Sequence, residues 1–217
     1  MKYLTLIFIL LFSYSIMNSQ TISELFIDVP DTSILNLTKD YRQKIVKNHK
    51  AGKTSPDKRT DLEEGIYYFF NVLDLKNGYL KLSGAMEGHI QMCYWNMEDK
   101  SKLIAVYQEG CGPGCYVEKF DFYRYKNKVF TPLDFKKIIP DVYNDFIKGD
   151  KKTIEQQMEK DDIAASLLFE LPRNGKNITA KWGNLESDSK YRKYAKGNRM
   201  VLQWNNGTFR QGEVFWK

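Results

Sequence analysis

Three cysteines are the residues of this chain whose type and spacing could do chemistry: Cys93, Cys111 and Cys115. The last two enclose a Gly-Pro-Gly tripeptide between two strand-like segments, so they would oppose each other at the base of a hairpin. Opposed residues of an antiparallel pair have Cα atoms within the span of a disulfide. We therefore predict a structural disulfide between Cys111 and Cys115 that locks the turn and the strand register.

Other states of these cysteines stay open. Cys93 could pair with either of the other two, or all three thiols could be free. A redox dithiol at Cys111 and Cys115 is a second hypothesis, although no predicted helix follows either cysteine to lower a thiol pKa. Three thiolates together with His89 would supply the four ligands of a zinc site. The spacing of the cysteines alone does not indicate a metal, and none is predicted.

The two histidines, His49 and His89, limit the enzyme classes that the chain could belong to. A histidine-based triad would have to use one of them. The sequence contains no nucleophile elbow, phosphate-binding loop, dinucleotide-binding glycine pattern or zinc-protease motif. Adjacent acids such as Glu63 and Glu64 point apart, whereas a glycosidase needs converging carboxyl groups. We therefore predict no catalytic residue and no cofactor.

Aromatic residues offer a third kind of site. Tyr94 and Trp95 are adjacent in an alternating segment, so they must face opposite sides of a sheet. If one is buried, the other could contact a ligand such as a sugar. A carbohydrate-binding module that uses exposed aromatic residues is therefore a further hypothesis. The competing interpretation is packing, which aromatic residues in strands normally serve.

The first half of the chain predicts helices followed by strands. Ile22–His49 is helical in pattern, with Thr38 as a helix N-cap, and residues 51–60 are predicted to be a loop. Asn77–Gly78 predicts a type I′ hairpin turn. In the last predicted strand of this half, alternation places Tyr116 on the same face as Phe120 and Phe122. The predicted strands are Ile66–Leu73, Gly88–Asn96, Lys102–Gln108 and Tyr116–Tyr125. Their short connections are typical of an antiparallel meander.

The second half predicts a helical insertion and then more strands. Thr131–Pro132 has the pattern of a helix cap followed by proline at the first helical position. The predicted helices are Leu133–Ile139, Asp141–Ile147 and Lys151–Lys160, and the predicted strands are Ser166–Leu171, Asn177–Trp182, Met200–Trp204 and Thr208–Phe215. We therefore predict an α+β fold, in which an antiparallel β-meander sheet carries N-terminal helices and a mid-chain helical insertion.

The N-terminus has the features of an export signal. A basic residue precedes the apolar run Leu4–Phe12, and small polar residues follow, which is the order of a secretory signal peptide. The run is far shorter than the ~20 residues that a helix needs to span a bilayer. We expect cleavage after Ser15 or Ser19, with residues 1–19 as the signal. Residues 20–217 would then form a single domain, in the periplasm or at the cell surface, without a transmembrane anchor.

The charge pattern argues against a nucleic-acid partner. The formal net charge is +6, which could suggest a polyanion. However, basic residues are interleaved with acidic ones, and the only basic cluster with few acids is Lys190–Arg199. We interpret that segment as solvated surface and predict no nucleic-acid binding.

Two segments near the N-terminus resemble a known family. Leu25–Thr32 (LFIDVPDT) and Leu37–Arg42 (LTKDYR) are together similar to the opening of a family of exported proteins of unknown function from the Bacteroidota. A Gly-Pro turn between two strands, here Gly112–Pro113, is a further likeness, and Cys111 and Cys115 around it depart from the usual pattern. The resemblance implies export and an α+β fold, and it implies no catalytic residues. We expect an exported non-catalytic binding or accessory module with a protein or glycan partner at the cell envelope.

Overall fold

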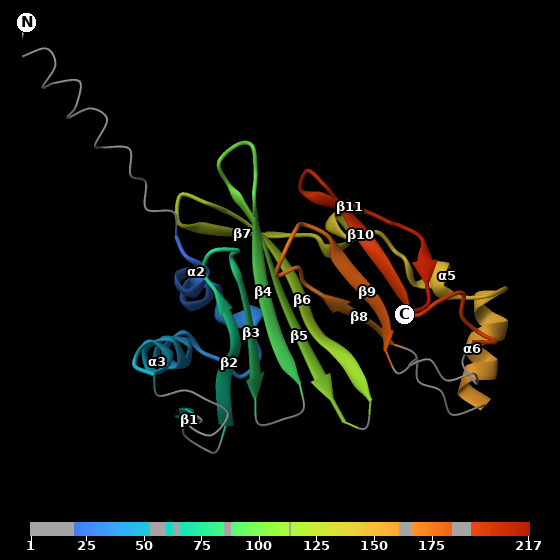
Figure 1. Cartoon of the computed structure of the whole chain (residues 1–217), viewed down its shortest axis with the longest axis horizontal. Coiled ribbons are helices and arrows are strands. Elements are labelled where there is room, and N and C mark those ends of the chain that lie inside the picture. Colours follow the sequence, from blue (N-terminus) through green and yellow to red (C-terminus); the bar gives the residue numbers. More distant parts are fainter. Residues whose placement is uncertain are drawn as a thin grey trace, which may run out of the picture.

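A computed structural model describes residues 20–52, 60–62, 66–84, 88–112, 114–160, 166–183 and 192–217. The predicted signal peptide and Pro113 lie outside these ranges. Antiparallel strands form two sheets, and helices precede and interrupt the strands along the chain (Figure 1). The predicted α+β class is confirmed. Every helix within these ranges is too short or too polar to cross a membrane.

The larger sheet is the predicted meander, because its seven strands lie side by side in chain order. They are β1 (Thr60–Leu62), β2 (Ile66–Asp74), β3 (Tyr79–Gly84), β4 (His89–Asn96), β5 (Lys102–Cys111), β6 (Cys115–Lys126) and β7 (Val129–Leu133). Tight turns join neighbours: Asn127 and Lys128 both have positive φ, 52° and 65°. Such a two-residue turn matches the right-handed twist of its strands.

The smaller sheet contains the C-terminal strands, in the order β11-β10-β9-β8, with β12 also paired to β10. They are β8 (Ser166–Glu170), β9 (Ile178–Gly183), β10 (Arg199–Asn205), β11 (Thr208–Arg210) and β12 (Val214–Phe215). Their sequences predict most of these strands but do not reveal that they leave the meander and form a second sheet. Because β8 ends the order, one of its edges is left without a neighbouring strand.

Each face of the larger sheet has its own apolar core. One face packs against α2 (Ile22–Asp28), the short 3₁₀ helix η1 (Asp31–Ser33) and α3 (Lys39–Lys50). The other faces the smaller sheet together with α4 (Phe135–Ile138), α5 (Tyr143–Phe146) and α6 (Lys151–Lys160). Figure 1 shows α2 and α3 on one side of the larger sheet and the smaller sheet on the opposite side. Alternation along a strand feeds both cores, as with Leu80 and Tyr79.

Local predictions for the turns and helix starts need correction. The β2–β3 hairpin forms, but the turn before Tyr79 is not type I′, because Gly78 has a positive φ (65°) and Asn77 does not. Instead, Asp74 Oδ1 accepts a hydrogen bond from the Asn77 amide at 3.1 Å. Pro132 lies in β7 rather than at a helix start, and Asp134 caps α4. Proline is tolerated there because β7 is an edge strand.

Two predictions about strands are also wrong in detail. Tyr116 does not share a face with Phe120, because the register of β5 and β6 shifts between Gln108 and Glu109. This bulge turns Val117 into the core and leaves Tyr116 half-exposed. The predicted loop at residues 51–60 ends one residue too late, because Thr60 begins β1; residues 53–59 of that prediction lie outside the described ranges.

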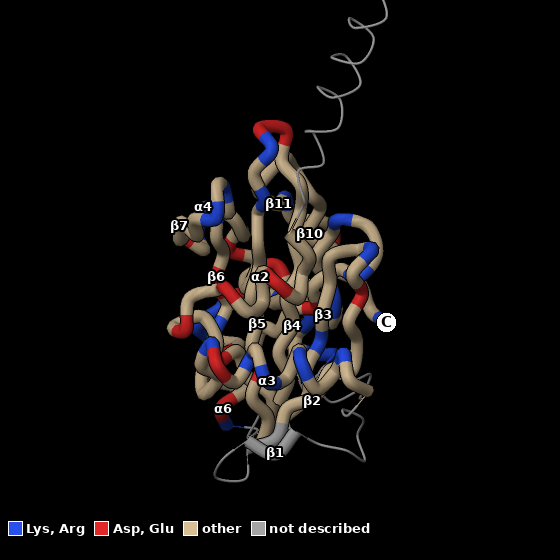
Figure 2. The backbone as a smooth tube through the Cα atoms, turned by 90° about the vertical axis from the view of Figure 1, so that its left-hand side faces the viewer, with Lys and Arg blue, Asp and Glu red and all other residues tan. Residues whose placement is uncertain are grey.

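Charged residues of both signs are interspersed over the described part of the chain (Figure 2). Ion pairs such as Arg124–Asp99 (2.8 Å) and Lys181–Glu170 (2.8 Å) neutralise charges locally. This pattern matches the alternation in the sequence.

Candidate functional site

Cys111 and Cys115 close the β5–β6 hairpin. They are paired across the last row of the two strands, with Cα atoms 4.0 Å apart and sulfur atoms at disulfide distance, 2.03 Å. Cys93 is buried on β4 opposite Ala105. At about 3.3 Å per residue, Ala105 and Cys111 are roughly 20 Å apart along β5. Cys93 therefore can neither pair with the other two cysteines nor join them around a metal.

Burial also limits the reactivity of the Cys93 thiol. Desolvation raises the pKa of its thiol well above the ordinary value, because a low-dielectric environment disfavours the thiolate. A protonated thiol is neither a good nucleophile nor a metal ligand. Cys93 is therefore a small apolar residue of the core.

Polar side chains follow the disulfide along the same face of the larger sheet. On β5, Tyr107, Glu109 and Cys111 alternate with residues that face α2 and α3, so they share one face. On β4, His89 lies opposite Glu109 and Gln91 lies opposite Tyr107. The five residues form one row of functional groups between the two sheets, which we call the intersheet cluster.

Gln91 and Tyr107 of the intersheet cluster hold the free edge of β8. The Phe169 amide donates to Tyr107 Oη at 3.2 Å, and the Leu171 amide donates to Gln91 Oε1 at 3.0 Å. Gln91 Nε2 also donates to the Phe169 carbonyl at 3.4 Å. Backbone groups of an edge strand must find partners when buried, and these two side chains provide them.

The contacts of Gln91 determine the protonation of His89. Gln91 Oε1 accepts from the Leu171 amide, so Nε2 is the amide group that faces His89 Nε2 at 2.8 Å. An amide NH₂ can only donate, so His89 Nε2 is the acceptor and the ring proton is on Nδ1. That nitrogen faces Glu109 Oε1 at 3.6 Å. The tautomer is one that catalytic histidines use, but the lone pair needed for a general base is already occupied.

The electrostatic environment keeps His89 neutral. Burial, together with the charges of Lys81 and Lys181, lowers the pKa of His89 to about 4, although Glu170 opposes the shift. Burial likewise raises the pKa of Tyr107 far above its ordinary value, so the phenol remains protonated and donates to Glu109 Oε2 at 2.8 Å. Near neutral pH the cluster therefore contains a neutral imidazole, a protonated phenol and a buried carboxyl group.

Glu109 also lies beside the disulfide. Its Oε1 is 3.7 Å from Cys111 Sγ, and donor atoms of Glu109, Cys111 and Cys115 all lie within 4.8 Å of one another. The sequence-based zinc hypothesis chose Cys93 and His89 as the partners of this pair, whereas the structure places Glu109 there. Spacing could have indicated it, because residues two apart on a strand share a face.

The predicted ligand contacts lie elsewhere on β4. Trp95 is 3% exposed, stacks on Trp204 with ring centroids 5.4 Å apart, and donates to the Lys176 carbonyl. Tyr94 is half-buried on the opposite face, against Gly78, with Lys102 Nζ 3.9 Å from the ring centroid. The predicted opposite orientation is therefore present, and both rings serve packing. Their role in ligand binding stays a prediction.

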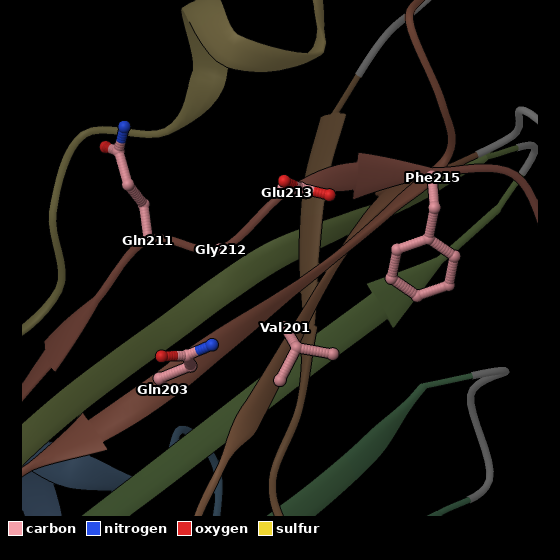
Figure 3. A pocket seen from close by; sticks show the side chains of 6 residues that line it. All are labelled: Val201, Gln203, Gln211, Gly212, Glu213 and Phe215. Carbon is pink, nitrogen blue, oxygen red and sulfur yellow. The ribbon is translucent and has the colours of Figure 1, made fainter.

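An open hollow of about 600 Å³ lies on the smaller sheet. Figure 3 shows Val201 and Gln203 of β10 on one side, Phe215 of β12 at one end, and the segment between β11 and β12 on the other side. It is lined by Val201, Gln203, Gln211, Gly212, Glu213 and Phe215. No motif marks these residues in the sequence. They come together because β12 returns to pair with the start of β10.

Comparisons with known proteins concern the fold and the family of the chain. A solved structure described as a domain of an uncharacterized protein from Porphyromonas gingivalis W83 is similar, with a TM-score of 0.64 and 15% sequence identity; the alignment covers 89% of this chain and 100% of that chain. At that identity the likeness concerns the fold. No match is found among curated proteins. Residues 14–209 match the family described as "Protein of unknown function (DUF3256)", and the chain therefore belongs to that family.

Proposed function

We propose that the protein is an exported, non-catalytic binding or accessory module that meets a protein or glycan partner at the cell envelope. The observation that carries this proposal is the difference in how the two candidate sites use their polar groups. In the intersheet cluster, Gln91 and Tyr107 hold β8, and His89 Nε2 accepts a hydrogen bond from Gln91. The hollow on the smaller sheet is open, and among the described residues no such network occupies the groups that line it.

The chemistry of the hollow suits a polar ligand with an apolar face. Phe215 is 40% exposed and offers a ring for stacking. Gln203, Gln211 and Glu213 are exposed and supply amide and carboxylate groups for hydrogen bonds. Aromatic contact combined with a few polar groups is typical of small-ligand sites, and sugars present both kinds of surface.

The experiment is a binding and turnover screen on the mature protein. Labelled residues 20–217 are applied to an oligosaccharide array, and hits are titrated by intrinsic fluorescence. Phe215→Ala should abolish binding, whereas Tyr116→Ala, which removes another exposed aromatic side chain, should not. Turnover of hydrolase or thiol-disulfide substrates by the purified protein would contradict the proposal. Export is tested separately by N-terminal sequencing of protein from the envelope, with cleavage expected after Ser15 or Ser19.

A thiol-disulfide redox protein is the second candidate, and the contact between Glu109 and Cys111 favours it. A carboxylate near the sulfur could accept the proton of a reacting thiol. Redox equilibration decides between the two: a potential below about −300 mV marks a structural bridge. A higher potential with catalytic turnover of a disulfide substrate would support the redox function instead.

A further inference from the structure

We propose that reduction of the Cys111–Cys115 pair opens a zinc-binding site whose ligands are the two thiolates and Glu109. The donor atoms of these three residues already lie within 4.8 Å of one another. The inference is independent of the proposed function, because the hollow on the smaller sheet contributes none of these groups.

Glu109 is the residue that points to a ligand. Its side chain is 7% exposed, and burial of a carboxylate is costly unless its oxygens are paired. Oε2 accepts from Tyr107 Oη at 2.8 Å. Oε1 faces Cys111 Sγ at 3.7 Å and His89 Nδ1 at 3.6 Å. A disulfide sulfur has no hydrogen to donate, and 3.6 Å is too long for a good hydrogen bond. Among the described residues, Oε1 therefore lacks a close donor while the pair is oxidised.

The surroundings of Glu109 preorganise Oε1 toward the sulfur atoms. Tyr107 is fully buried and is itself fixed by the Phe169 amide, so it holds Oε2 in place. His89 carries its ring proton on Nδ1, on the side of Oε1, and Gln91 fixes that ring orientation. Side chains that orient a ligating carboxylate in this way are typical of metal sites. His89 would therefore act beside the ligand set and not within it.

The ligand types select zinc over the commoner hard cations. Thiolates are soft ligands that suit zinc, whereas calcium and magnesium prefer sets of oxygen atoms. Two thiolates and a carboxylate are three protein ligands, which leaves the fourth tetrahedral position open to water. The two cysteines lie opposite each other with Cα atoms 4.0 Å apart, so both sulfurs can reach one ion.

The reaction that opens the site is a two-electron reduction. A dithiol reductant donates two electrons and two protons, the bond between Cys111 Sγ and Cys115 Sγ breaks, two thiols form, and the reductant becomes a disulfide. Zinc then displaces both thiol protons into solvent. The bound set carries two thiolate charges and one carboxylate charge against the two positive charges of the metal. Oxidation releases the metal, because it removes two of the three ligands.

The experiment compares the oxidised and reduced mature protein. Reduction with a phosphine, followed by its removal without air, leaves Cys111 and Cys115 as thiols. Zinc affinity is measured by competition with a chromophoric chelator, and cobalt is added as a spectroscopic probe. We expect one zinc per reduced chain, thiolate-to-cobalt charge-transfer absorption, and no binding by the oxidised chain. Equal binding by both forms, or none by the reduced and folded form, would overturn the inference.

Variants assign the ligands. Glu109→Gln should weaken zinc binding by roughly 10- to 100-fold or more, the range seen when groups that support a metal site are removed. Cys111→Ser and Cys115→Ser should each remove the cobalt charge-transfer band of a two-thiolate site. Glu118→Gln changes another carboxylate of the β5–β6 hairpin and Cys93→Ala removes the buried thiol, and both should bind as the parent does. Near-ultraviolet circular dichroism confirms that each variant is folded. Unchanged affinity in Glu109→Gln would rule out the carboxylate as a ligand.

Discussion

The two faces of the larger sheet each bury a charged residue, and they treat it differently. On the helix-covered face, Arg42 is fully buried, and its two Nη atoms donate to the carbonyls of Leu37, Ile27 and Val29. Asp31 lies 3.0 Å from Nη1. On the opposite face, Glu109 has one close donor within the described ranges, Tyr107. The fold explains the burial of Arg42, because its charge is hydrogen-bonded. Glu109 Oε1 has no close donor in those ranges and is therefore able to bind a further ligand.

The contacts of Arg42 explain how the N-terminal helices are held. α2, η1 and α3 are joined by short turns whose carbonyl groups point inward, at the end of α2 and just before α3. The guanidinium donates to three of these carbonyls, which lie 5, 13 and 15 residues before it in the chain. Only Nε lacks a partner among the described residues. The charge therefore fastens a layer that would otherwise bury unpaired carbonyl groups.

The largest effect is expected at Arg42. Arg42→Met keeps an apolar stem but removes the guanidinium, so three carbonyls and the charge of Asp31 lose their partner. We expect a loss of about 3–5 kcal/mol in the free energy of unfolding, measured by urea denaturation. Lys44→Met, on the same helix, is the control and should cost less than about 1 kcal/mol. A similar, small loss of stability in both variants would show that the buried charge of Arg42 does not hold the N-terminal helices.

The pH dependence of stability should report on His89. Its folded pKa of about 4 lies below the ordinary value of 6.5. Between these pH values the unfolded chain takes up a proton that the folded chain does not, so stability falls as pH falls from 6.5 to 4. At about 1.4 kcal/mol per pKa unit, the loss is at most about 3 kcal/mol. His89→Gln should flatten this part of the stability curve, measured by urea denaturation at several pH values.

The other histidine provides the control for this titration. His49 lies on the helix-covered face, edge-on to Phe70, and His49→Gln should retain the pH dependence that His89 causes. If the His89→Gln curve has the same slope as the parent between pH 6.5 and 4, the interpretation that His89 is buried and neutral in the folded protein is wrong.

Tyr107→Phe should have an intermediate effect. The substitution keeps the ring in the core but deprives the Phe169 amide of its acceptor and Glu109 of its close donor. A buried group left unpaired costs about 1–3 kcal/mol. We expect a loss of about 2 kcal/mol, with faster amide hydrogen exchange at Phe169. Tyr79→Phe is the matched control, because the Tyr79 hydroxyl makes one long hydrogen bond, to Gln91 Oε1 at 3.3 Å, in the part of the chain that the structure describes. Equal losses would show that β8 does not depend on Tyr107.

Much of this fold could be predicted because its signals are local. Asn206 adopts positive φ between the predicted strands Met200–Trp204 and Thr208–Phe215, and Thr38 precedes α3. Prediction failed where a distant contact decides the outcome. Tyr116 changes face because its own strand, β6, has one extra residue where it pairs with β5, and Pro132 is accepted in a strand because β7 is an edge.

The candidate sites likewise divide into those that local sequence predicts and those that depend on distant contacts. The cysteine pair could be predicted because two opposed residues in one hairpin are close in sequence. The hydrogen bonds of Tyr107 and Gln91 to β8 could not, since they join residues 62 and 80 positions apart. The hollow depends on β12 returning to β10, which no local pattern indicates. Glu109 is the intermediate case: its face follows from alternation, but its burial depends on the second sheet.

The smallest change in stability is expected for Glu109→Gln in the oxidised protein, and here the sign of the change is what distinguishes the two faces. The amide that replaces the carboxylate would still offer an oxygen to Tyr107 Oη. The substitution also removes a buried negative charge whose Oε1 faces a sulfur without a hydrogen. Because relieving an unpaired buried group is favourable, we expect the oxidised variant to be more stable than the parent by about 1 kcal/mol. Urea denaturation of matched oxidised samples measures this difference.

The same substitution should act in the opposite direction once the disulfide is reduced. A thiol at Cys111 can donate to Glu109 Oε1, so the reduced parent gains a hydrogen bond that the oxidised parent lacks. The corresponding bond in Glu109→Gln is weaker, because hydrogen bonds to charged groups are the stronger kind. The variant should therefore favour the oxidised pair relative to the parent, which redox equilibration against a dithiol measures directly. A loss of stability in both redox states would mean that Glu109 is already satisfied in the oxidised fold. The two faces of the sheet would then not differ in how they treat a buried charge.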